Sequence, residues 1–131
     1  MPFLGIDHPA ISCYDVRKQI EWYCSHLGMK VIASNGQTPA SVVVGYGQSV
    51  RDGAMIELMP AKDEGPPPTD VPRFAPGIRH IAFRVTDFDR AYAQLKAAGV
   101  EYLFETAQAV GGGRIVSFRD PEGNELQIVE R

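Results

Sequence analysis

One pattern occurs twice in the chain, and it constrains the fold more than any other feature. His8-Pro-Ala-Ile-Ser-Cys-Tyr-Asp15 aligns with His80-Ile-Ala-Phe-Arg-Val-Thr-Asp87, with seven steps from histidine to aspartate in both copies. In each copy an amphipathic segment ending in glycine follows, and then three short apolar segments, the last of which carries Glu57 or Glu125. The histidine-to-glutamate separations, 49 and 45 residues, differ by no more than a loop insertion. Such self-similarity predicts two copies of one βαβββ unit.

Each copy contains one predicted helix with recognisable ends. Asp15 and Asp87 are good N-caps, because a short carboxylate accepts from the free N–H groups of the first turn. Gly28 and Gly99 follow as C′ residues, where a left-handed backbone costs glycine little. The apolar residues at helical spacing are Val16, Ile20, Tyr23 and Leu27 in the first copy and Phe88, Ala91, Leu95 and Ala98 in the second.

The later strands of each copy are predicted to form antiparallel hairpins. In the first copy these strands span residues 41–46 and 54–59. In the second they span residues 114–119 and 124–129, around Asp120-Pro-Glu-Gly123, a tetrapeptide that suits a type I turn. Helices and hairpins in this order predict an α+β fold with mixed sheets and the helices on one face.

The 131 residues are predicted to form a single domain with two modules, residues 1–60 and 78–131. Residues 61–77 lie between them, and five of these seventeen residues are proline, which favours an extended, stiff connector. At about 3.1 Å per residue the connector could span about 50 Å. That reach leaves open whether the second module packs beside the first module of its own chain or of another chain.

Composition and charge exclude several classes of function. A net charge of −3 and a pI near 5.5, without a run of Lys and Arg, argue against nucleic-acid binding. No apolar signal segment follows Met1-Pro2, and we expect no membrane association. Cys13 and Cys24 have no CxxC spacing, so we expect reduced thiols and a cytoplasmic protein.

Four acidic and imidazole side chains are predicted to lie on the strand faces away from the helices. A lone histidine or glutamate on a strand is usually a surface residue, but the repeat places a histidine early and a glutamate late in both copies. Two imidazoles and two carboxylates suit one divalent first-row cation, Zn, Ni, Co, Mn or Fe, with room for substrate. The predicted ligands are His8, Glu57, His80 and Glu125.

This arrangement resembles the vicinal oxygen chelate superfamily, which includes glyoxalase I, bleomycin-resistance proteins and extradiol dioxygenases. The resemblance covers essentially the whole chain, and its most specific parts are Asp7-His8, Ile56-Glu57-Leu58, His80-Ile-Ala-Phe and Asp120-Pro-Glu-Gly-Asn-Glu125. The resemblance implies that the two sheets curl into a cupped, partly open barrel, often completed in a homodimer. It also implies that the four predicted ligands hold one metal ion per paired set of modules.

The function that this resemblance implies is that of a metal-dependent lyase or isomerase of the glyoxalase type, acting on a small molecule. A metal that chelates two neighbouring substrate oxygens favours removal of a proton from the adjacent carbon and an enediolate-like intermediate. A glutamate that loosens from the metal then moves the proton to the neighbouring carbon. Glu125 is the first choice for this base and Glu57 the second, and the sequence does not separate them.

Two departures from the glyoxalase I pattern concern the substrate. Glyoxalase I typically has an arginine four residues after its first ligand, which holds glutathione, and this chain has Ser12 there. It also tends to carry Asn-Trp-Gly after the glutamate ligand, where this chain runs Leu58-Met59-Pro60-Ala61. Arg84, on the predicted His80 face, could hold an anionic substrate instead, or simply pair with a neighbouring acid. Arg84 and Ser12 are therefore the candidate substrate-binding residues.

Two other functions remain open at this point. An Fe(II) extradiol-type dioxygenase needs two histidines and one carboxylate, which His8, His80 and Glu125 would provide. The extra Glu57 argues against it, because that side chain would fill a position that oxygen or substrate needs. A non-catalytic binding protein of the bleomycin-resistance kind would use the same cup, but such binders commonly lack the metal ligands.

Overall fold

A computed structural model describes residues 1–63, 65 and 67–131 of the chain. These residues form two compact units, Met1–Gly65 and Pro66–Arg131, each of which contains one copy of the repeat. The boundary between the units falls within the predicted connector. Glu64 and Pro66, which belong to that connector, lie outside the described residues.

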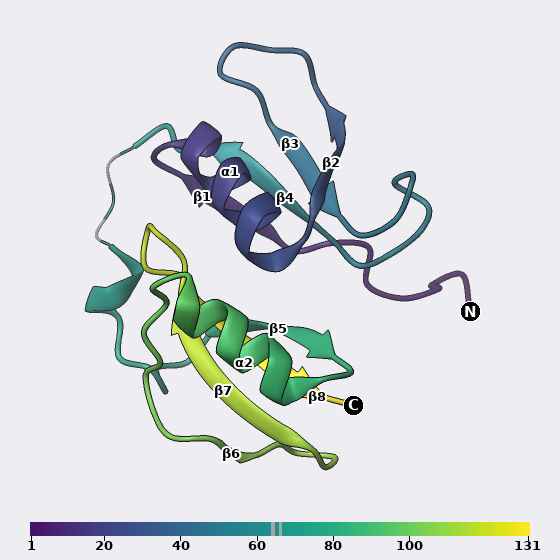
Figure 1. The fold of residues 1–131 in the computed structure, drawn as a ribbon. Coiled ribbons are helices and arrows are strands. Elements are labelled where there is room, and N and C mark those ends of the chain that lie inside the picture. Colours follow the sequence, from purple (N-terminus) through teal and green to yellow (C-terminus); the bar gives the residue numbers. More distant parts are fainter. Residues whose placement is uncertain (64, 66) are drawn as a thin grey trace. The chain divides into compact units, whose positions relative to one another are not determined.

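The first unit is a four-stranded mixed sheet with one helix (Figure 1). Its strand order is β1-β4-β3-β2, with β1 parallel to β4 and the other neighbours antiparallel. In chain order the elements are β1 Ala10–Cys13, α1 Val16–Leu27, β2 Lys30–Ser34, β3 Val42–Gly45 and β4 Met55–Pro60.

The second unit repeats this topology with the order β5-β8-β7-β6, and β5 is parallel to β8 (Figure 1). A short 3-10 helix, η1, precedes its sheet at Pro68–Asp70. The other elements are β5 His80–Val85, α2 Phe88–Ala97, β6 Ala107–Gln108, β7 Arg114–Arg119 and β8 Glu125–Glu130.

The predicted α+β class and the two tandem βαβββ modules are confirmed, and both sheets are open. Several boundaries differ from the prediction. The strands β4 and β8 lie one residue later than expected, and β6 has only two residues. The predicted connector is not simply extended, because η1 interrupts it. The cupped, partly open barrel that the family resemblance implies stays a prediction.

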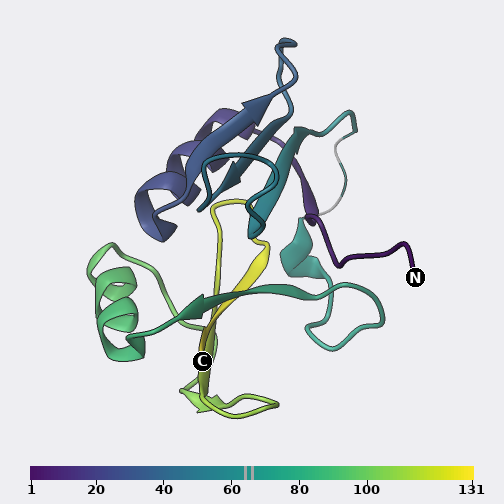
Figure 2. The ribbon, with the colours of Figure 1, turned by 90° about the vertical axis from the view of Figure 1, so that its right-hand side faces the viewer.

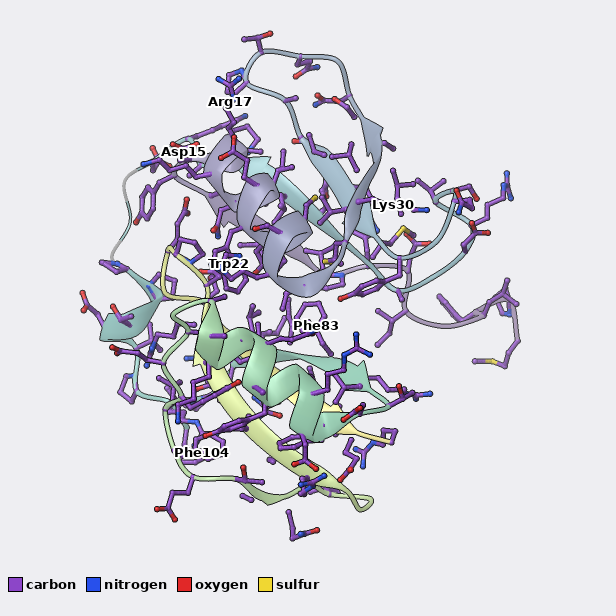
Figure 3. The ribbon with its side chains drawn as sticks, viewed as in Figure 1. Asp15, Arg17, Trp22, Lys30, Phe83 and Phe104 are labelled. Atoms are coloured by element: carbon purple, nitrogen blue, oxygen red, sulfur yellow. The ribbon has the colours of Figure 1, made fainter. Side chains whose placement is uncertain are left out.

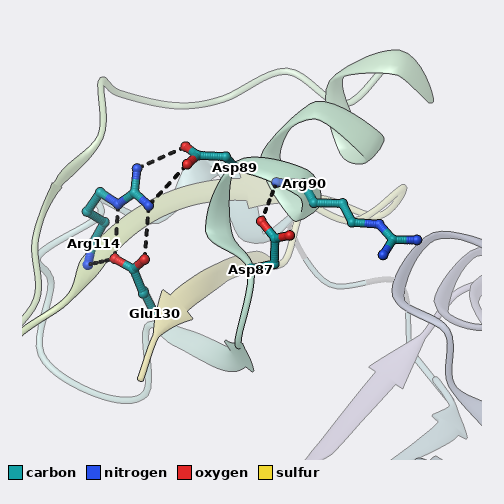
Figure 4. Close-up of polar contacts among 5 residues, drawn as sticks. All are labelled: Asp87, Asp89, Arg90, Arg114 and Glu130. Atoms are coloured by element: carbon teal, nitrogen blue, oxygen red, sulfur yellow. Dashed lines mark hydrogen bonds and ion pairs between the residues drawn. The ribbon is translucent and has the colours of Figure 1, made fainter.

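The helix ends follow the capping signals in the sequence. Asp15 Oδ1 accepts a hydrogen bond from the backbone N–H of Lys18 at 3.0 Å. Asp87 Oδ1 accepts from the backbone N–H of Arg90 at the same distance (Figure 4). Gly28 ends the first helix with a left-handed φ of 69°, which a residue with a side chain rarely adopts.

Each unit has its own hydrophobic core between the helix and one face of its sheet. Figure 2 shows the helix of each unit on one side of its sheet. Because side chains alternate along a strand, the residues on either side of Glu57 and the residue after Glu125 enter these cores. The fully buried core residues include Tyr23, Val44 and Leu58 in the first unit and Val116, Phe118 and Leu126 in the second. The opposite face of each sheet is therefore left to carry the polar residues.

An ion-pair network in the second unit joins three of its elements (Figure 4). Arg114, at the start of β7, contacts Glu130 of β8 through Nη2 at 2.9 Å and Asp89 of α2 through Nη1 at 2.9 Å. The hydrogen bonds from Arg114 are the largest cause of the lowered pKa of Glu130. The guanidinium also lies over the Phe88 ring at 4.6 Å from its centroid. This network fixes the start of α2 against the sheet.

Candidate functional site

The first unit brings two of the four predicted ligands together. Glu57 lies on β4, on the sheet face that α1 does not cover, and its backbone N–H donates to the carbonyl of Pro9 at 3.0 Å. His8 Nε2 lies 3.4 Å from Glu57 Oε2. The prediction that His8 is part of the opening strand is wrong, because β1 begins at Ala10. Proline at position 9 has no N–H for a sheet ladder, which explains the later start.

Asp7 orients the ring of His8. Its Oδ2 lies 2.7 Å from His8 Nδ1, and because an ionised carboxylate can only accept, Nδ1 carries the proton. This hydrogen bond is the largest cause of the raised pKa of His8, and Glu57 also raises that pKa. A carboxylate on the far nitrogen of a histidine is the usual outer partner of a metal ligand. The sequence contained this signal in the Asp7-His8 dipeptide, but no role was predicted for Asp7.

The geometry around Nε2 of His8 fits a cation. With its proton on Nδ1, the neutral imidazole directs the lone pair of Nε2 toward Glu57 Oε2, and two lone pairs at 3.4 Å repel each other. A second proton or a metal ion between these atoms removes the repulsion. Two ligands bound at about 2.1 Å to one metal lie about 3.0 to 3.4 Å apart for bond angles of about 90 to 109°. The spacing of the pair therefore suits two ligands of one metal.

The second unit brings the other two predicted ligands together. His80 and Glu125 are direct partners in the parallel ladder of β5 and β8, and His80 Nδ1 lies 3.6 Å from Glu125 Oε2. The same carboxylate oxygen lies 3.4 Å from the hydroxyl of Ser117, which donates to it. The Glu125 side chain is only 8% exposed, against 31% for Glu57. The glutamate of the second pair is thus the more enclosed of the two, whereas His80, at 40% exposed, is slightly more open than His8, at 33%.

Arg73 completes the surroundings of Glu125, a role that the sequence alone does not predict. Its Nε donates to Glu125 Oε1 at 2.9 Å. The guanidinium lies 4.2 Å from the ring centroid of Phe104, which belongs to the segment between α2 and β6 (Figure 3). Arg73 comes from the proline-rich segment expected to be only a spacer. An Arg-Phe dipeptide among prolines is the one signal that could have drawn attention to it.

The sheet registers show that the two glutamates are not at equivalent positions of the repeat. Ala10 pairs with Glu57 in the first unit, whereas the matching Ala82 pairs with Gln127 in the second. Glu125 is two residues earlier on its strand than the counterpart of Glu57. A shift of two residues keeps a side chain on the same face, so both glutamates still lie opposite the core. The prediction that Glu57 and Glu125 occupy equivalent positions of the repeat is therefore wrong. The prediction that both lie on the sheet face opposite the core is correct.

The candidate substrate-binding residues lie farther along the same strands. Arg84 is exposed and lies four residues after His80 on β5, about 13 Å along a strand, on the same face. Ser12 is exposed on β1 and is paired in the ladder with Met59 of β4. Among the described residues, neither forms an ion pair with the histidine–glutamate pair of its own unit. Their predicted role concerns a more distant part of a substrate.

The donor set of each unit fits a divalent first-row metal, because imidazole nitrogens and carboxylate oxygens are ordinary ligands of such ions. Within residues 1–63, 65 and 67–131 no group of three or more His, Cys, Asp or Glu side chains is arranged to hold a metal, so each unit by itself supplies two ligands. The joining of both pairs in one site stays a prediction.

Comparison with known proteins identifies the family to which the chain belongs. The family model described as Glyoxalase/Bleomycin resistance protein/Dioxygenase superfamily matches residues 5–128. The chain belongs to this superfamily. The recognised resemblance is therefore confirmed, and the α+β fold of two repeated modules is the fold of a superfamily member.

Individual superfamily relatives cover nearly the whole chain. The uncharacterized protein YwkD of Bacillus subtilis (strain 168) is 30% identical, with 97% of each chain covered. A lactoylglutathione lyase of Escherichia coli O157:H7 is 27% identical over 94% of this chain and 90% of that enzyme. The crystal structure of a superfamily member from Sphaerobacter thermophilus DSM 20745, 21% identical, matches the fold with a TM-score of 0.72 over 100% of both chains.

The superfamily includes enzymes and non-enzymes, so the histidine–glutamate pairs of this chain carry the functional argument. None of the helices in the described part of the chain has the length and apolar character needed to cross a membrane. Cys13, which is buried, and Cys24, which is half-buried, are both thiols and are not joined in a disulfide.

Proposed function

We propose that this superfamily member is a divalent-metal-dependent lyase or isomerase of the glyoxalase type, in which His8, Glu57, His80 and Glu125 hold one metal ion. The observation that carries the proposal is the arrangement of Asp7, His8 and Glu57. Asp7 fixes the proton on Nδ1 of His8, which leaves Nε2 directed at Glu57 Oε2 at 3.4 Å. A surface histidine needs no such arrangement, whereas a metal ligand benefits from it.

The second pair supports the same proposal. His80 and Glu125 face each other across the β5–β8 ladder, and their nearest side-chain atoms lie at a similar distance, 3.6 Å. Both pairs thus supply one nitrogen and one oxygen. The proposal leaves open whether the two pairs of one site belong to one chain or to two chains of a homodimer.

The chemistry follows from the properties of the four residues. A bound divalent cation supplies Lewis-acid stabilisation of the negative charge that develops on the substrate oxygens. One of the two glutamate carboxylates takes a proton from the carbon next to the carbonyl and returns it to the neighbouring carbon, through an enediolate-like intermediate. The two histidines, which carry no charge when their lone pairs bind, keep the site from becoming too anionic for that proton transfer.

The proposed substrate is a small molecule with two neighbouring oxygens, as in α-hydroxycarbonyl compounds, or an acyl thioester. Arg84, about 13 Å along β5 from His80, would hold an anionic group at the distant end of such a substrate. At Ser12 the ladder partner is the half-exposed, apolar Met59. This neighbourhood favours an apolar substrate portion there, in contrast to the arginine with which glyoxalase I holds glutathione.

Cys13 and Cys24 are not joined in a disulfide, which supports our further proposal of a reducing, cytoplasmic location. That location is consistent with metabolism of a small soluble compound. The geometry of the site does not depend on this location.

Solvent-deuterium exchange tests the proposed reaction. The purified protein, reconstituted with Ni²⁺, Co²⁺, Zn²⁺ or Mn²⁺, would be incubated in D₂O with candidate α-hydroxycarbonyl and acyl-thioester substrates. We expect deuterium at the carbon next to the carbonyl, without oxygen consumption. Oxygen consumption would indicate a dioxygenase instead. Ligand binding without exchange or oxygen consumption by the metal-loaded protein would indicate a binding protein and contradict the proposal.

A further inference from the structure

The two oxygens of the Glu125 carboxylate have different surroundings. Oε1 accepts a hydrogen bond from Arg73 Nε at 2.9 Å. Oε2 lies 3.6 Å from His80 Nδ1 and 3.4 Å from the hydroxyl of Ser117. The side chain is only 8% exposed, so water competes little for either oxygen. One oxygen is therefore engaged by an arginine, while the other is directed to the histidine.

Arg73 is itself held in place by aromatic rings. Its guanidinium carbon lies 4.2 Å from the ring centroid of Phe104 and 5.1 Å from that of Phe74. Such cation–π contacts are stabilising, and more so where water is partly excluded. A planar guanidinium that rests on a ring can direct its N–H groups only within one plane. Arg73 thus restricts the rotation of the Glu125 carboxylate.

Glu57 lacks an equivalent restraint among the described residues. Its side chain is 31% exposed, and its ion-pair partner there is His8, at 3.4 Å. No arginine or lysine of the part of the chain that the structure describes lies within ion-pair distance of it. A base of this reaction must leave the metal, reach a carbon atom and return. For Glu57 this movement breaks no ion pair with an arginine, whereas for Glu125 it would break the contact with Arg73.

We infer that Arg73 is a positioning residue that fixes Glu125 as a ligand through Oε2, and that Glu57 is the glutamate that carries the proton. This inference rests on the proposed function and assigns separate roles to two residues that the sequence left undivided. Arg73 acts through Glu125 and does not touch the reacting atoms. The proline-rich segment thereby contributes to the site, as well as linking the modules.

Cobalt binding by the full-length protein tests the role of Arg73. The variants are Arg73→Gln, Arg73→Lys and the control Arg90→Gln, whose side chain extends away from the ion pairs drawn in Figure 4. Loss of an outer-shell partner typically lowers metal affinity about 10- to 100-fold, and we expect this for Arg73→Gln in a Co²⁺ titration. Arg73→Lys keeps the charge and should recover part of the loss. Arg90→Gln should bind Co²⁺ as the wild type does.

The visible spectrum of bound Co²⁺ adds a readout that general destabilisation would not change. The spectrum reports ligand number and geometry, and we expect Arg73→Gln to change it, because a freed Glu125 can rotate. Arg73→Lys should restore the wild-type spectrum at least in part. Thermal unfolding of the metal-free variants identifies any that fail to fold, and Arg73→Lys then provides the comparison.

The two glutamates are compared in the same titration and in deuterium exchange. We expect Glu57→Gln to bind Co²⁺ within about tenfold of the wild type, but to exchange about 10²- to 10⁴-fold more slowly, because an amide cannot take the proton. Glu125→Gln should lose Co²⁺ affinity more severely than Arg73→Gln.

Distinct outcomes overturn the inference and the proposed function. If the wild type binds Co²⁺ but Arg73→Gln binds it as well or more tightly, Arg73 is a spectator or competes with the metal, and the inference is wrong. The inference is also wrong if Glu125→Gln keeps the metal and loses exchange while Glu57→Gln keeps both. If the wild type binds no Co²⁺, the proposed function fails, and the role of Arg73 fails with it.

Discussion

The two units share a backbone plan but differ in how each presents its histidine and glutamate. In the second unit His80 lies within β5 and directly opposite Glu125. In the first unit His8 lies before β1, while Glu57 is opposite Ala10. The first pair is oriented by Asp7, next to the histidine, and the second by Arg73, which contacts the glutamate. The same fold therefore holds a similar histidine–glutamate pair in both units, but different neighbouring residues orient it.

This difference shows that the repeat preserves the sheet face on which a residue lies more strictly than the position of that residue along the strand. Glu57 and Glu125 differ by two places in the register, yet both lie opposite their cores. A shift by one residue would have buried a carboxylate among apolar side chains. The repeat could thus be altered in steps of two without loss of either core, which allows the pairs to acquire different neighbours.

The largest expected effect concerns the cores. Phe118 of β7 is fully buried, and its counterpart in β3 is the smaller Val44, also fully buried. We expect Phe118→Ala to lower the free energy of unfolding by about 3 to 5 kcal/mol, because it leaves a cavity. Val44→Ala should cost less, since fewer atoms are removed. Urea denaturation measures both, and an equal cost would contradict the proposed difference between the two cores.

The next largest effect concerns the metal. Removing one of four ligands should cost roughly a quarter of a binding free energy that is typically about 10 to 16 kcal/mol, so His80→Ala should weaken Ni²⁺ binding about 100-fold or more. Isothermal titration with Ni²⁺ measures the change. His26→Ala is the control, because His26 stacks on Trp22 of α1, at 4.9 Å between ring centroids. Equal affinities of the two variants would mean that His80 is not a ligand.

A smaller effect should distinguish the first pair from the second. Asp7→Asn keeps the shape of the side chain but removes the charge that holds the Nδ1 proton of His8. We expect a loss of Ni²⁺ affinity of about 10- to 100-fold, as for other outer partners of histidine ligands. Asp63→Asn, an exposed aspartate of the same unit, serves as the control. Equal Ni²⁺ affinities of these two variants would mean that Asp7 does not support the metal site.

The smallest effect is specific to the second unit and depends on pH. The pKa of Glu130 is lowered from its usual 4.5, mainly by hydrogen bonds from Arg114. A lowered folded-state pKa stabilises the protein above the usual pKa, and that stability is lost as the pH falls through the folded-state value. Arg114→Gln should therefore lower the melting temperature at pH 7, and by less at pH values below 4.5, such as pH 3.

The control for this pH dependence is Arg90→Gln on α2 of the same unit. It should show no difference between the two pH values. The first unit has Pro60 and Arg17 at the positions that match Glu130 and Asp89, so it has no counterpart of this network. If Arg114→Gln destabilises the protein equally at pH 3 and pH 7, the destabilisation comes from lost packing and not from the lost ion pair with Glu130.

Much of the fold could be predicted because its signals are local. Asp15 and Asp87 cap their helices, Gly28 ends the first one, and alternation placed the three predicted ligands that lie on strands opposite the cores. The register of the first unit could not be predicted, because a slip of two residues leaves the alternation unchanged. The start of β1 after His8 was missed although Pro9 signals it.

The residues that contact the two glutamates were harder to predict from the sequence. The contact between Arg73 and Glu125 joins residues 52 positions apart, and irregular segments carry no periodicity from which such a contact follows. Asp7 is adjacent to His8, but its role depends on ring orientation, which spacing does not encode. The chemical types at the site could be predicted, whereas their orientation required the structure.

If both pairs contribute to one metal site, the number of metal ions per chain is fixed, and metal stoichiometry measures it. Elemental analysis of the untagged protein, after reconstitution with Ni²⁺, Co²⁺, Zn²⁺ or Mn²⁺ and removal of excess metal, gives the number of ions per chain. We expect close to one divalent ion per chain, whether a site is built from one chain or two, and loss of that ion in both His8→Ala and His80→Ala. No retained metal, or two ions per chain with each histidine variant losing only one, would contradict it.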